Sequence, residues 1–546
     1  MSGPVKVDVL VVGSGAAGLS AAVTAAMHGA SVMVAEKASV LGGTSAWSGG
    51  WLWIPRNPLA RAEGIDEAAD APLTYLQHEM GGEAADIRLQ TFLRYGPEMV
   101  EFFHQRTAVQ FLSGSAMPDF HPSPGAANGG RSVTAQPYDG RLLGDWLHRL
   151  RPPLETISLG GMGIAGGADM AHFFNATRSP RSALYAARRL LRHGWQRLRA
   201  GRGQHLVNGN ALVARLLRSA LDAGVRFQLN APVVRLLQGP PGVSGAVLRS
   251  DGGEIHVEAG AVVLACGGFP HDRQRLAQVV PHAAEGYGHF SAAPPDNQGE
   301  GIRLGESVGG QFDTSLRHPL AWAPVSQPGV IAVLPNGKRF VNEADSYHDF
   351  IAALLAATPA GDTPQAWLLA DRRTLRRYGL GHARPFPFTP TAWLRTGYLQ
   401  RGNTLAELAK QCAIDANALA ETVERFNHFA SAGEDVDFHR GASAYNRAQG
   451  DHQVTLGPLR EGPFYAVRIL PGSLGTFSGL QTDEHARVLD EQQQPIPGLY
   501  AIGNDMSSVM RGYYPSGGIT LGPAMTFGYL VGKNLAKKTN INNNIT

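Results

Sequence analysis

The stretch from Val7 to Glu36 constrains the fold more than any other part of the sequence. Val7–Val12 is an apolar, β-branched run typical of a buried parallel strand. A GxGxxG motif, an alanine-rich helical stretch to Gly29 and a second short strand ending at Glu36 follow it. In such a unit the first glycine makes the turn, the second admits a pyrophosphate and the third lets the helix pack on the strand, while the acid binds ribose hydroxyls. The unit therefore predicts a dinucleotide-binding site in a Rossmann-like α/β domain.

A second glycine-rich loop, Leu41–Gly50, follows directly. Its small side chains and hydroxyls suit backbone that lies against a cofactor. A nicotinamide enzyme has no obvious use for a second loop here, whereas FAD is long enough to need one along its diphosphate and isoalloxazine. The cofactor contacts predicted from these two loops are Gly13, Ser14, Gly15, Ala16, Ala17, Gly18, Glu36, Lys37, Gly42, Gly43, Thr44, Ser45, Ser48, Gly49 and Gly50.

With 546 residues the chain exceeds one ordinary core, which favours two domains. Strand-like runs at Ala261–Leu264 and Ile496–Ile502 return the chain to the first sheet and add Ala265, Gly267, Gly503 and Asn504 to the predicted cofactor contacts. The βαβ pattern disappears in between. We therefore predict an FAD-binding domain from residues 1–280 and 472–546, with an inserted α+β substrate domain over 281–471.

The net charge of +3 gives no indication of nucleic-acid binding, and the two cysteines provide no metal cage. Few cysteines fit a reducing compartment, so we expect a cytoplasmic protein. Arg178–Arg202 is the only charge-biased segment, with eight arginines among leucines and a tryptophan. It is open to two interpretations: a basic amphipathic helix resting on anionic lipid of the inner membrane, or a solvated or internally paired face.

Near the C-terminus, Tyr513–Pro523 joins two tyrosines to a glycine-rich turn that opens a helix. A helix start offers free N–H groups and a positive dipole end, which suit an electron-rich ring edge or a carbonyl oxygen. Tyr514, four residues before Gly518, could donate a hydrogen bond to the same oxygen. We expect Gly518, Thr520 and Leu521 also to face the cofactor.

These motifs resemble the fumarate reductase and succinate dehydrogenase flavoprotein superfamily. The resemblance rests on the GxGxxG unit, Gly42–Ser45, Gly337–Glu343 and the Gly503 strand. Within that superfamily, Tyr514-Pro515, Gly518 and Thr520–Tyr529 resemble the 3-ketosteroid Δ1-dehydrogenases. The resemblance covers nearly the whole chain.

Three departures separate the chain from its relatives. Succinate dehydrogenases bind FAD covalently through a histidine near the second glycine loop; none occurs here, so noncovalent FAD is expected. Tyr347 takes the place of the catalytic arginine of fumarate reductases, which argues against a dicarboxylate. Phe120-His121 stands where the steroid dehydrogenases have a tyrosine pair.

The resemblance implies a mechanism in which Tyr514 O–H and Gly518 N–H polarise a ketone, Tyr347 removes the α-proton and hydride passes to the flavin. His121 would assist the base. The implied partners are a small apolar ketosteroid and an unknown electron acceptor, with a quinone as one candidate. Ser516 resembles the serine of 3-oxo-5α-steroid Δ4-dehydrogenases, so that activity is the alternative. An ene-reductase and a non-catalytic flavin carrier also stay open.

Overall fold

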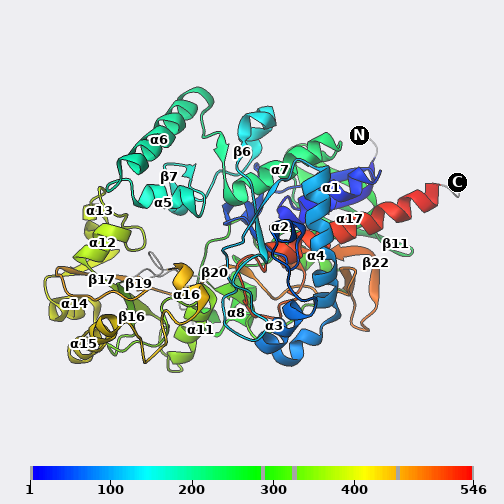
Figure 1. Ribbon diagram of the computed structural model, residues 1–546. Helices are drawn as coiled ribbons and strands as arrows, with labels where there is room; N and C mark the ends of the chain where they lie inside the picture. Colours follow the sequence, from blue (N-terminus) through cyan, green and yellow to red (C-terminus); the bar gives the residue numbers. More distant parts are fainter. Residues whose placement is uncertain (1–3, 285–288, 323–328, 450–454, 544–546) are drawn as a thin grey trace.

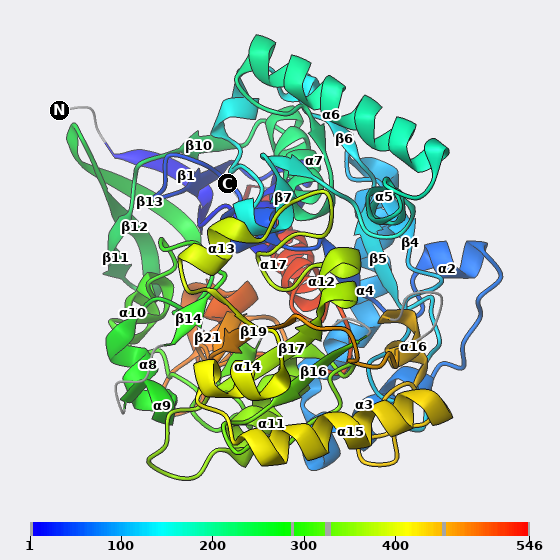
Figure 2. The ribbon, with the colours of Figure 1, turned by 90° about the vertical axis from the view of Figure 1, so that its left-hand side faces the viewer.

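The computed structural model describes residues 4–284, 289–322, 329–449 and 455–543. Figure 1 shows a larger region on the right and a smaller one on the left. The larger region contains both ends of the described chain, and the smaller region comes from its middle. Helix α6 (Pro180–Ala200) lies along the upper edge of the molecule (Figures 1 and 2).

The larger region is built on an eight-stranded sheet. Five strands run parallel in the order β10 (Arg226–Gln228), β2 (Val32–Ala35), β1 (Val5–Val12), β13 (Gly253–Leu264) and β22 (Pro495–Ala501). The sheet continues through antiparallel pairs of β13 with β12 (Gly242–Ser250), β12 with β11 (Val233–Gly239) and β22 with β21 (Arg487–Leu489). The predicted strands at both ends of the chain are therefore confirmed. Their carboxyl ends meet at one edge, where open α/β sheets bind ligands.

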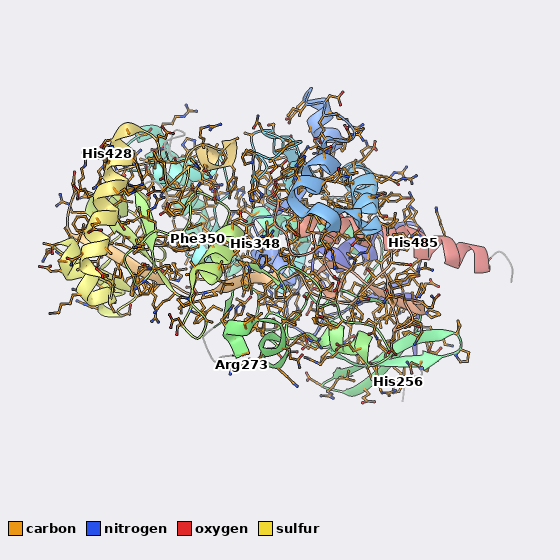
Figure 3. The ribbon with its side chains drawn as sticks, turned by 90° about the horizontal axis from the view of Figure 1, so that it is seen from below. His256, Arg273, His348, Phe350, His428 and His485 are labelled. Atoms are coloured by element: carbon orange, nitrogen blue, oxygen red, sulfur yellow. The ribbon has the colours of Figure 1, made fainter. Side chains whose placement is uncertain are left out.

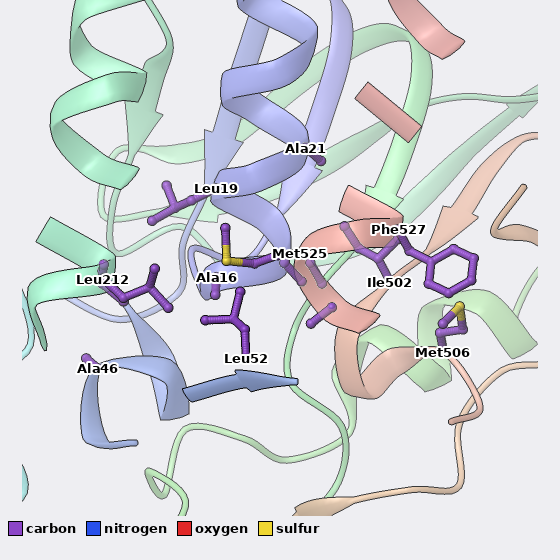
Figure 4. Packing of buried hydrophobic residues seen from close by; sticks show 14 of the residues in the cluster. Ala16, Leu19, Ala21, Ala46, Leu52, Leu212, Ile502, Met506, Met525 and Phe527 are labelled. Atoms are coloured by element: carbon purple, nitrogen blue, oxygen red, sulfur yellow. The ribbon is translucent and has the colours of Figure 1, made fainter. Parts of the chain in front are cut away.

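Helix α1 (Ala16–Met27) packs against α7 (Asn208–Asp222) and α17 (Leu521–Asn543). Two glycines let α17 approach α1 closely. A Cβ atom at Gly528 would lie 2.6 Å from the Ala17 carbonyl oxygen, and one at Gly532 would lie 2.7 Å from that of Ala21. Figure 4 shows Ala16 and Leu19 of α1 beside Met525 of α17. The N-terminal unit and the C-terminal helix thus share one core.

The smaller region has a four-stranded antiparallel sheet of its own. Its strands in spatial order are β16 (Val330–Val333), β17 (Ala366–Asp371), β19 (Phe464–Ile469) and β18 (Leu399–Gly402). Helices α14 (Leu405–Cys412) and α15 (Ala416–Ala432) pack on it around a separate apolar cluster that includes Ile331, Leu408 and Phe426.

Other elements lie at the junction of the two regions. A three-stranded sheet joins β14 (Phe290–Ser291), β20 (Gly472–Thr476) and β15 (Leu320–Trp322). Helix α10 (Glu300–Glu306) packs on β11 and β13 of the large sheet. Helix α11 (Tyr347–Ala357) is central: Figure 3 shows its His348 between His428 of the smaller region and His256 and His485 of the larger one.

Helix α4 (Ile87–Arg106) packs against α17, and α3 (Ala71–Met80) lies at the bottom of the molecule in Figure 1. Of all helices within the described ranges, none combines the length and the apolar character needed to cross a bilayer.

Candidate active site

A cavity of about 640 Å³ lies at the edge where the parallel strands end. Val12, Ala35, Ala265 and Gly503 line it, and each of them lies at or just beyond the carboxyl end of a strand. The cavity reaches as far as Tyr347 and Tyr514. A single cavity therefore connects the predicted cofactor loops with the predicted catalytic tyrosines.

Most of the predicted cofactor contacts line this cavity. They are Gly13, Ser14, Gly15, Ala16, Ala17, Glu36, Lys37, Gly43, Thr44, Ser45, Ser48, Gly49, Gly50, Ala265, Gly267, Gly503, Asn504, Gly518, Thr520 and Leu521. Gly18 and Gly42, the other two predicted contacts, are not among the residues that line the cavity. A Cβ atom at Gly18 would lie 2.1 Å from the Gly13 carbonyl oxygen, so this glycine permits close packing of α1 on β1. Gly42 adopts φ +114°, a conformation that favours glycine, and starts the second loop.

The Glu36 carboxylate holds the first glycine loop. One oxygen accepts hydrogen bonds from the Ser14 N–H (3.1 Å) and hydroxyl (2.6 Å), and the other accepts from the Ala38 N–H (2.9 Å). These bonds fix the carboxylate at the end of β2, in the wall of the cavity. Its position suits the ribose-binding role expected of an acid after the second strand.

The start of α1 fits the diphosphate of a dinucleotide. The N-cap residue Gly15 makes no side-chain cap, and the one first-turn N–H that has a side-chain acceptor in the described residues is that of Ala16, which donates to Ser45 Oγ at 3.0 Å. A Cβ atom at Gly43 would meet nothing within 4 Å, so backbone there is open to a ligand. Free N–H groups and a positive dipole end are the usual requirements for phosphate binding. The residues present therefore fit FAD.

The wall offers no evident covalent attachment point. Histidine is absent from the described lining residues. The Cys266 thiol lies at the cavity, but burial, together with the nearby Asp505 carboxylate, raises its pKa well above the usual value. A thiol held in its protonated form is a poor nucleophile.

Several cavity residues have no signal in the sequence. Asn297 donates to Thr44 Oγ1 (2.9 Å) and to the Gly267 carbonyl (3.2 Å), so it ties the second glycine loop to the turn after β13. Glu300 forms an ion pair with Lys37. Both come from the segment 281–471, which the sequence pattern predicts to bind substrate rather than cofactor. Only the packing of α10 on the large sheet brings them here.

Arg151 is another residue that the sequence does not single out. It pairs with Asp296 at 2.5 Å, and its guanidinium lies over the Trp47 ring at 5.5 Å. The buried Asp505 carboxylate accepts from the N–H groups of Cys266 (2.6 Å) and Gly268 (3.0 Å), which fixes the turn after β13.

At the other predicted site, Tyr347 and Tyr514 meet although 167 positions separate them. The Tyr347 hydroxyl donates to the Tyr514 hydroxyl at 2.7 Å. Burial raises the pKa of Tyr347 well above its usual value, and the Tyr514 hydroxyl adds to this. Burial also raises the pKa of Tyr514, to about 12, although hydrogen bonds with Tyr347 and Thr520 lower it in part. Both phenols are therefore protonated in the resting protein at neutral pH.

Gly518 shares this part of the wall. Its φ is +103°, and a Cβ atom would lie 2.6 Å from the Trp53 nitrogen, so no other residue fits without rearrangement. Its carbonyl oxygen accepts from the Trp53 N–H at 3.0 Å, while its own N–H has no partner in the described residues. An oxygen atom in the cavity could accept from this N–H and from Tyr514.

Phe120 packs on both tyrosines. Its ring stacks on Tyr514 at 5.8 Å, meets Tyr347 edge-on at 5.9 Å and lies 4.3 Å from the ring of Tyr445. Phe120, Met117 and Tyr445 line the cavity. The sequence shows an aromatic residue at this place, but its contact with both tyrosines follows only from the tertiary structure.

His121 lies elsewhere than the sequence suggested. Its Nε2 lies 2.8 Å from Asp349 and its Nδ1 2.5 Å from Glu79, so neither nitrogen is available to the Tyr347 hydroxyl. Burial alone would lower the pKa of His121, but the two carboxylates raise it to about 10. The positive charge of the His121 ring therefore interacts with these two carboxylates and not with the Tyr347 hydroxyl. His121 thus connects α3 with the first turn of α11, which carries Tyr347.

Ser516 is buried and does not line the cavity, although Tyr514 and Gly517 on either side of it do. Burial raises the pKa of the Asp119 carboxylate near it, an effect that the Arg131 guanidinium opposes in part. Asp119 accepts hydrogen bonds from Trp53 Nε1 (2.8 Å) and from Arg131 (2.6 Å), whereas the buried Ser516 hydroxyl has no hydrogen-bond partner among the described residues. Ser516 therefore lies near a polar cluster that is outside the described cavity wall.

A parallel sheet with a dinucleotide cradle at its edge, continuous with a pair of buried tyrosines, defines the class of flavin-dependent oxidoreductases. The chain belongs to the family described as FAD binding domain, whose model matches residues 8–521. Its cofactor is FAD, and it is an oxidoreductase of the kind that acts on CH–CH groups.

The chain is similar to named relatives over nearly its whole length. A 4-oxocyclohex-2-ene-1-carboxylate 5-dehydrogenase of Sinomonas cyclohexanicum is 39% identical, over 97% of this chain and 94% of that protein. A 3-oxosteroid 1-dehydrogenase of Mycolicibacterium smegmatis is 35% identical, over 97% of each.

Among solved structures, the 3-ketosteroid Δ1-dehydrogenase from Sterolibacterium denitrificans in complex with 1,4-androstadiene-3,17-dione superposes with a TM-score of 0.88. It is 36% identical, with 98% of this chain and 100% of that chain covered. The predicted family, the fold class and FAD are thus confirmed.

Proposed function

We propose that this chain is a 3-oxosteroid dehydrogenase that introduces a double bond between C1 and C2 of a 3-oxosteroid. One observation carries the proposal: the hydroxyls of Tyr347 and Tyr514 lie 2.7 Å apart, beside the free N–H of Gly518, in the cavity that fits FAD. Trp51, Met117 and Phe120 supply apolar wall nearby. The similarity to 3-oxosteroid 1-dehydrogenases supports the same reaction.

The first step is polarisation of the ketone. The substrate C3 oxygen would accept hydrogen bonds from the Tyr514 hydroxyl and the Gly518 N–H. Because the Tyr347 hydroxyl donates to Tyr514, the proton of Tyr514 is free for the ketone. Donors placed where negative charge develops are commonly the largest catalytic contribution.

The second step is proton transfer to the base. Tyr347 would take the proton from C2, the carbon next to the polarised carbonyl. Burial opposes its ionisation, so the base is the small fraction of Tyr347 that has already lost its proton to solvent, and this fraction grows with pH. When bound, FAD supplies the acceptor for the hydride that leaves C1. The steroid loses one proton and one hydride, and the C1–C2 double bond forms.

The position of Ser516 favours the Δ1 reaction over the Δ4 alternative. A serine that acts on substrate should line the cavity, whereas Ser516 is buried and does not belong to the described lining residues. The Δ4 activity is therefore the less supported regiochemistry.

A second candidate substrate is a monocyclic oxo acid. It is favoured by the higher identity, 39% against 35%, to a 4-oxocyclohex-2-ene-1-carboxylate 5-dehydrogenase than to a 3-oxosteroid 1-dehydrogenase. The charges of the cavity favour a neutral substrate, however. Lys37 and Arg151 are the cations of its described wall, and each pairs with a carboxylate. The same argument opposes fumarate reduction.

We further propose that the chain divides into a cofactor domain (1–280 and 472–546) and a substrate domain (281–471). We propose a quinone as the electron acceptor. We also propose that the protein is cytoplasmic and contacts the inner membrane through Arg178–Arg202. Both cysteines are free thiols, which supports a reducing compartment. No group of three or more His, Cys, Asp or Glu side chains in the described residues could hold a metal ion.

Anaerobic mixing tests the function. The purified protein is combined with androst-4-ene-3,17-dione, 5α-androstane-3,17-dione or 4-oxocyclohexanecarboxylate while FAD absorbance is followed, and NMR locates any new double bond. We expect bleaching by both steroids with a C1–C2 double bond. Bleaching by the oxo acid alone would establish the second candidate, and a C4–C5 double bond would establish the Δ4 reaction. No bleaching by any saturated ketone would refute the proposal.

A further inference from the structure

Asp345 is a carboxyl group of the cavity that the proposed reaction does not use. It lines the cavity two residues before Tyr347, just ahead of the first turn of α11. One of its carboxylate oxygens accepts a hydrogen bond from Asn446 Nδ2 at 3.0 Å. In the part of the chain that the structure describes, the other oxygen has neither a hydrogen-bond donor nor an ion-pair partner. Asp345 thus lines the cavity with half of its carboxylate unpartnered.

The other carboxylates of the described wall are compensated. Asp296 and Glu300 each form an ion pair with a basic side chain of the wall. Glu343 forms ion pairs with two buried arginines, and Glu36 accepts hydrogen bonds from the first glycine loop. A partly buried carboxylate without a cation is costly, so an uncharged side chain of the same size would stabilise the fold more at position 345.

Asp345 lies at the end of the cavity where the ketone would react. Tyr445 of helix α16 (Ala444–Gln449) shares this part of the wall. Its ring packs on Phe120 at 4.3 Å, and Phe120 contacts both tyrosines of the proposed reaction. Burial is the main cause of the raised pKa of Tyr445, and the charge of the Asp345 carboxylate contributes to it, so the two side chains are close.

The carboxyl group of Asp345 is ionised at neutral pH. Burial raises its pKa to about 6, and the hydrogen bond from Asn446 opposes this shift in part. The positive charge of the nearby His121 ring already interacts with Glu79 and Asp349. A negative charge without a counterion therefore remains at this end of the cavity above about pH 6.

We propose that Asp345 is a specificity-determining residue, whose uncompensated carboxylate repels substrates that carry a carboxylate and leaves the cavity to neutral ketones. Two negative charges in one partly buried cavity repel each other strongly, because little solvent screens them. The inference rests on the proposed function, because it takes the region near Tyr347 and Tyr514 to be the place of the substrate. It selects a neutral ketosteroid over the monocyclic oxo acid as the substrate class of this site.

The binding of two probes, 4-hydroxybenzamide and 4-hydroxybenzoate, tests the inference. They have nearly the same shape and differ in charge, the phenol of each can take the place of the ketone, and neither ring can be dehydrogenated. Each probe is titrated into the full-length, FAD-loaded protein at about pH 8. The change in flavin absorbance gives the dissociation constant.

Three proteins are compared: the natural chain, Asp345→Asn and Asp362→Asn. Asparagine at position 345 keeps the size of the side chain and an acceptor for Asn446, and it removes the charge. Asp362→Asn is the matched control, because it changes the net charge equally at an exposed position that does not line the cavity.

We expect the natural chain to bind the benzamide at least about tenfold more tightly than the benzoate. In Asp345→Asn this preference should disappear because the benzoate binds more tightly, while the affinity for the benzamide stays nearly the same. Asp362→Asn should keep the natural preference, since water and salt screen an exposed charge.

A pH series on the natural chain gives a second readout, which a purely structural role of Asp345 would not change. The preference for the benzamide should shrink from about pH 8 to about pH 5.5, because Asp345 takes up a proton while the benzoate stays ionised. The groups around Asp345 keep their charge over this range, because the pKa of the histidine is raised to about 10, those of the carboxyls are lowered and those of the phenols are raised. These groups are His121, Glu79, Asp349, Glu343 with its two arginines, Tyr347 and Tyr445.

Three results would overturn the inference. The first is a natural chain that does not prefer the benzamide at pH 8. The second is an Asp345→Asn variant that keeps the natural preference, or that weakens both probes alike, which would make Asp345 a structural residue of the loop before α11. The third is a preference that stays constant over the pH series, which decides the matter even if Asp345→Asn does not retain FAD. A failure of the proposed function is seen separately, as the absence of FAD bleaching by ketones.

Discussion

Tyr514→Phe is the substitution that separates ketone polarisation from every other role of the site. The Tyr514 ring is held by Phe120 at 5.8 Å, His348 at 5.6 Å and Phe477 at 6.0 Å. A phenylalanine ring fits the same packing, so the variant removes the hydroxyl and little else. FAD binding should be unchanged, because the cofactor cradle is built from other residues.

The expected loss follows from the geometry. Removing one of two donors to a developing oxyanion costs about 10²–10³ in rate, or about 3–4 kcal/mol. The Tyr347 hydroxyl loses its 2.7 Å acceptor, but it lies at the cavity wall, where water can replace Tyr514. The free energy of unfolding should therefore fall by only about 0.5–1.5 kcal/mol.

Single-turnover reduction measures the effect. Protein and saturating ketosteroid are mixed anaerobically in a stopped-flow instrument, and the rate of FAD bleaching is compared with that of the natural chain. Tyr445→Phe is the matched control, since Tyr445 also lines the cavity and packs on Phe120; we expect less than about a fivefold effect there. A Tyr514→Phe variant that reduces FAD within about tenfold of the natural rate would refute ketone polarisation by this hydroxyl.

Three other perturbations have equally definite outcomes. Because burial raises the pKa of Tyr347, the fraction present as base grows with pH, so kcat/KM should rise about tenfold per pH unit up to at least pH 9; a flat profile from pH 6 to 9 would exclude Tyr347 as the base. His121→Gln should lower the melting temperature most near pH 6 and less as the pH approaches 10. The reason is that a histidine whose folded pKa is about 10 stabilises the fold fully below its unfolded pKa and loses that effect as the pH rises. His78→Gln, at an exposed position, is the control, and an equal loss of melting temperature at every pH would contradict a charged His121 between two carboxylates. Gly13→Ala should yield colourless protein, since its Cβ would lie 2.3 Å from the Ala265 carbonyl oxygen; a normal ratio of FAD to protein would contradict the assigned cradle.

The parts of the fold that local sequence specifies could be predicted. The strand, glycine turn, helix and acid of residues 7–36 form from neighbours in the chain, and the Thr404 cap is also local: Thr404 Oγ1 accepts from the Glu407 N–H at 3.2 Å. The meeting of Tyr347 with Tyr514 could be expected only from a family resemblance, because no periodicity connects positions so far apart.

The misplaced and missed residues have a common physical reason. The family resemblance predicts that His121 assists the base, because the sequence does not reveal that Glu79 and Asp349 bind it from two other helices. The sequence does not indicate Asn297 and Glu300 because the βαβ pattern ends before them, and only the packing of α10 on the large sheet brings them to the glycine loops. In each case the decisive contact is between elements distant in the chain.

The close approach of α17 to α1 has a consequence for how the protein acquires its cofactor. Gly528 and Gly532 let α17 pack closely on Ala17 and Ala21 of α1, the helix that follows the first glycine turn. About 500 residues must leave the ribosome before α1 gains this neighbour, so a nascent chain carries the GxGxxG loop without its final support. FAD would then be captured after translation, and chains interrupted before α17 should be recognised by proteases as unfinished although they contain every residue of the first loop.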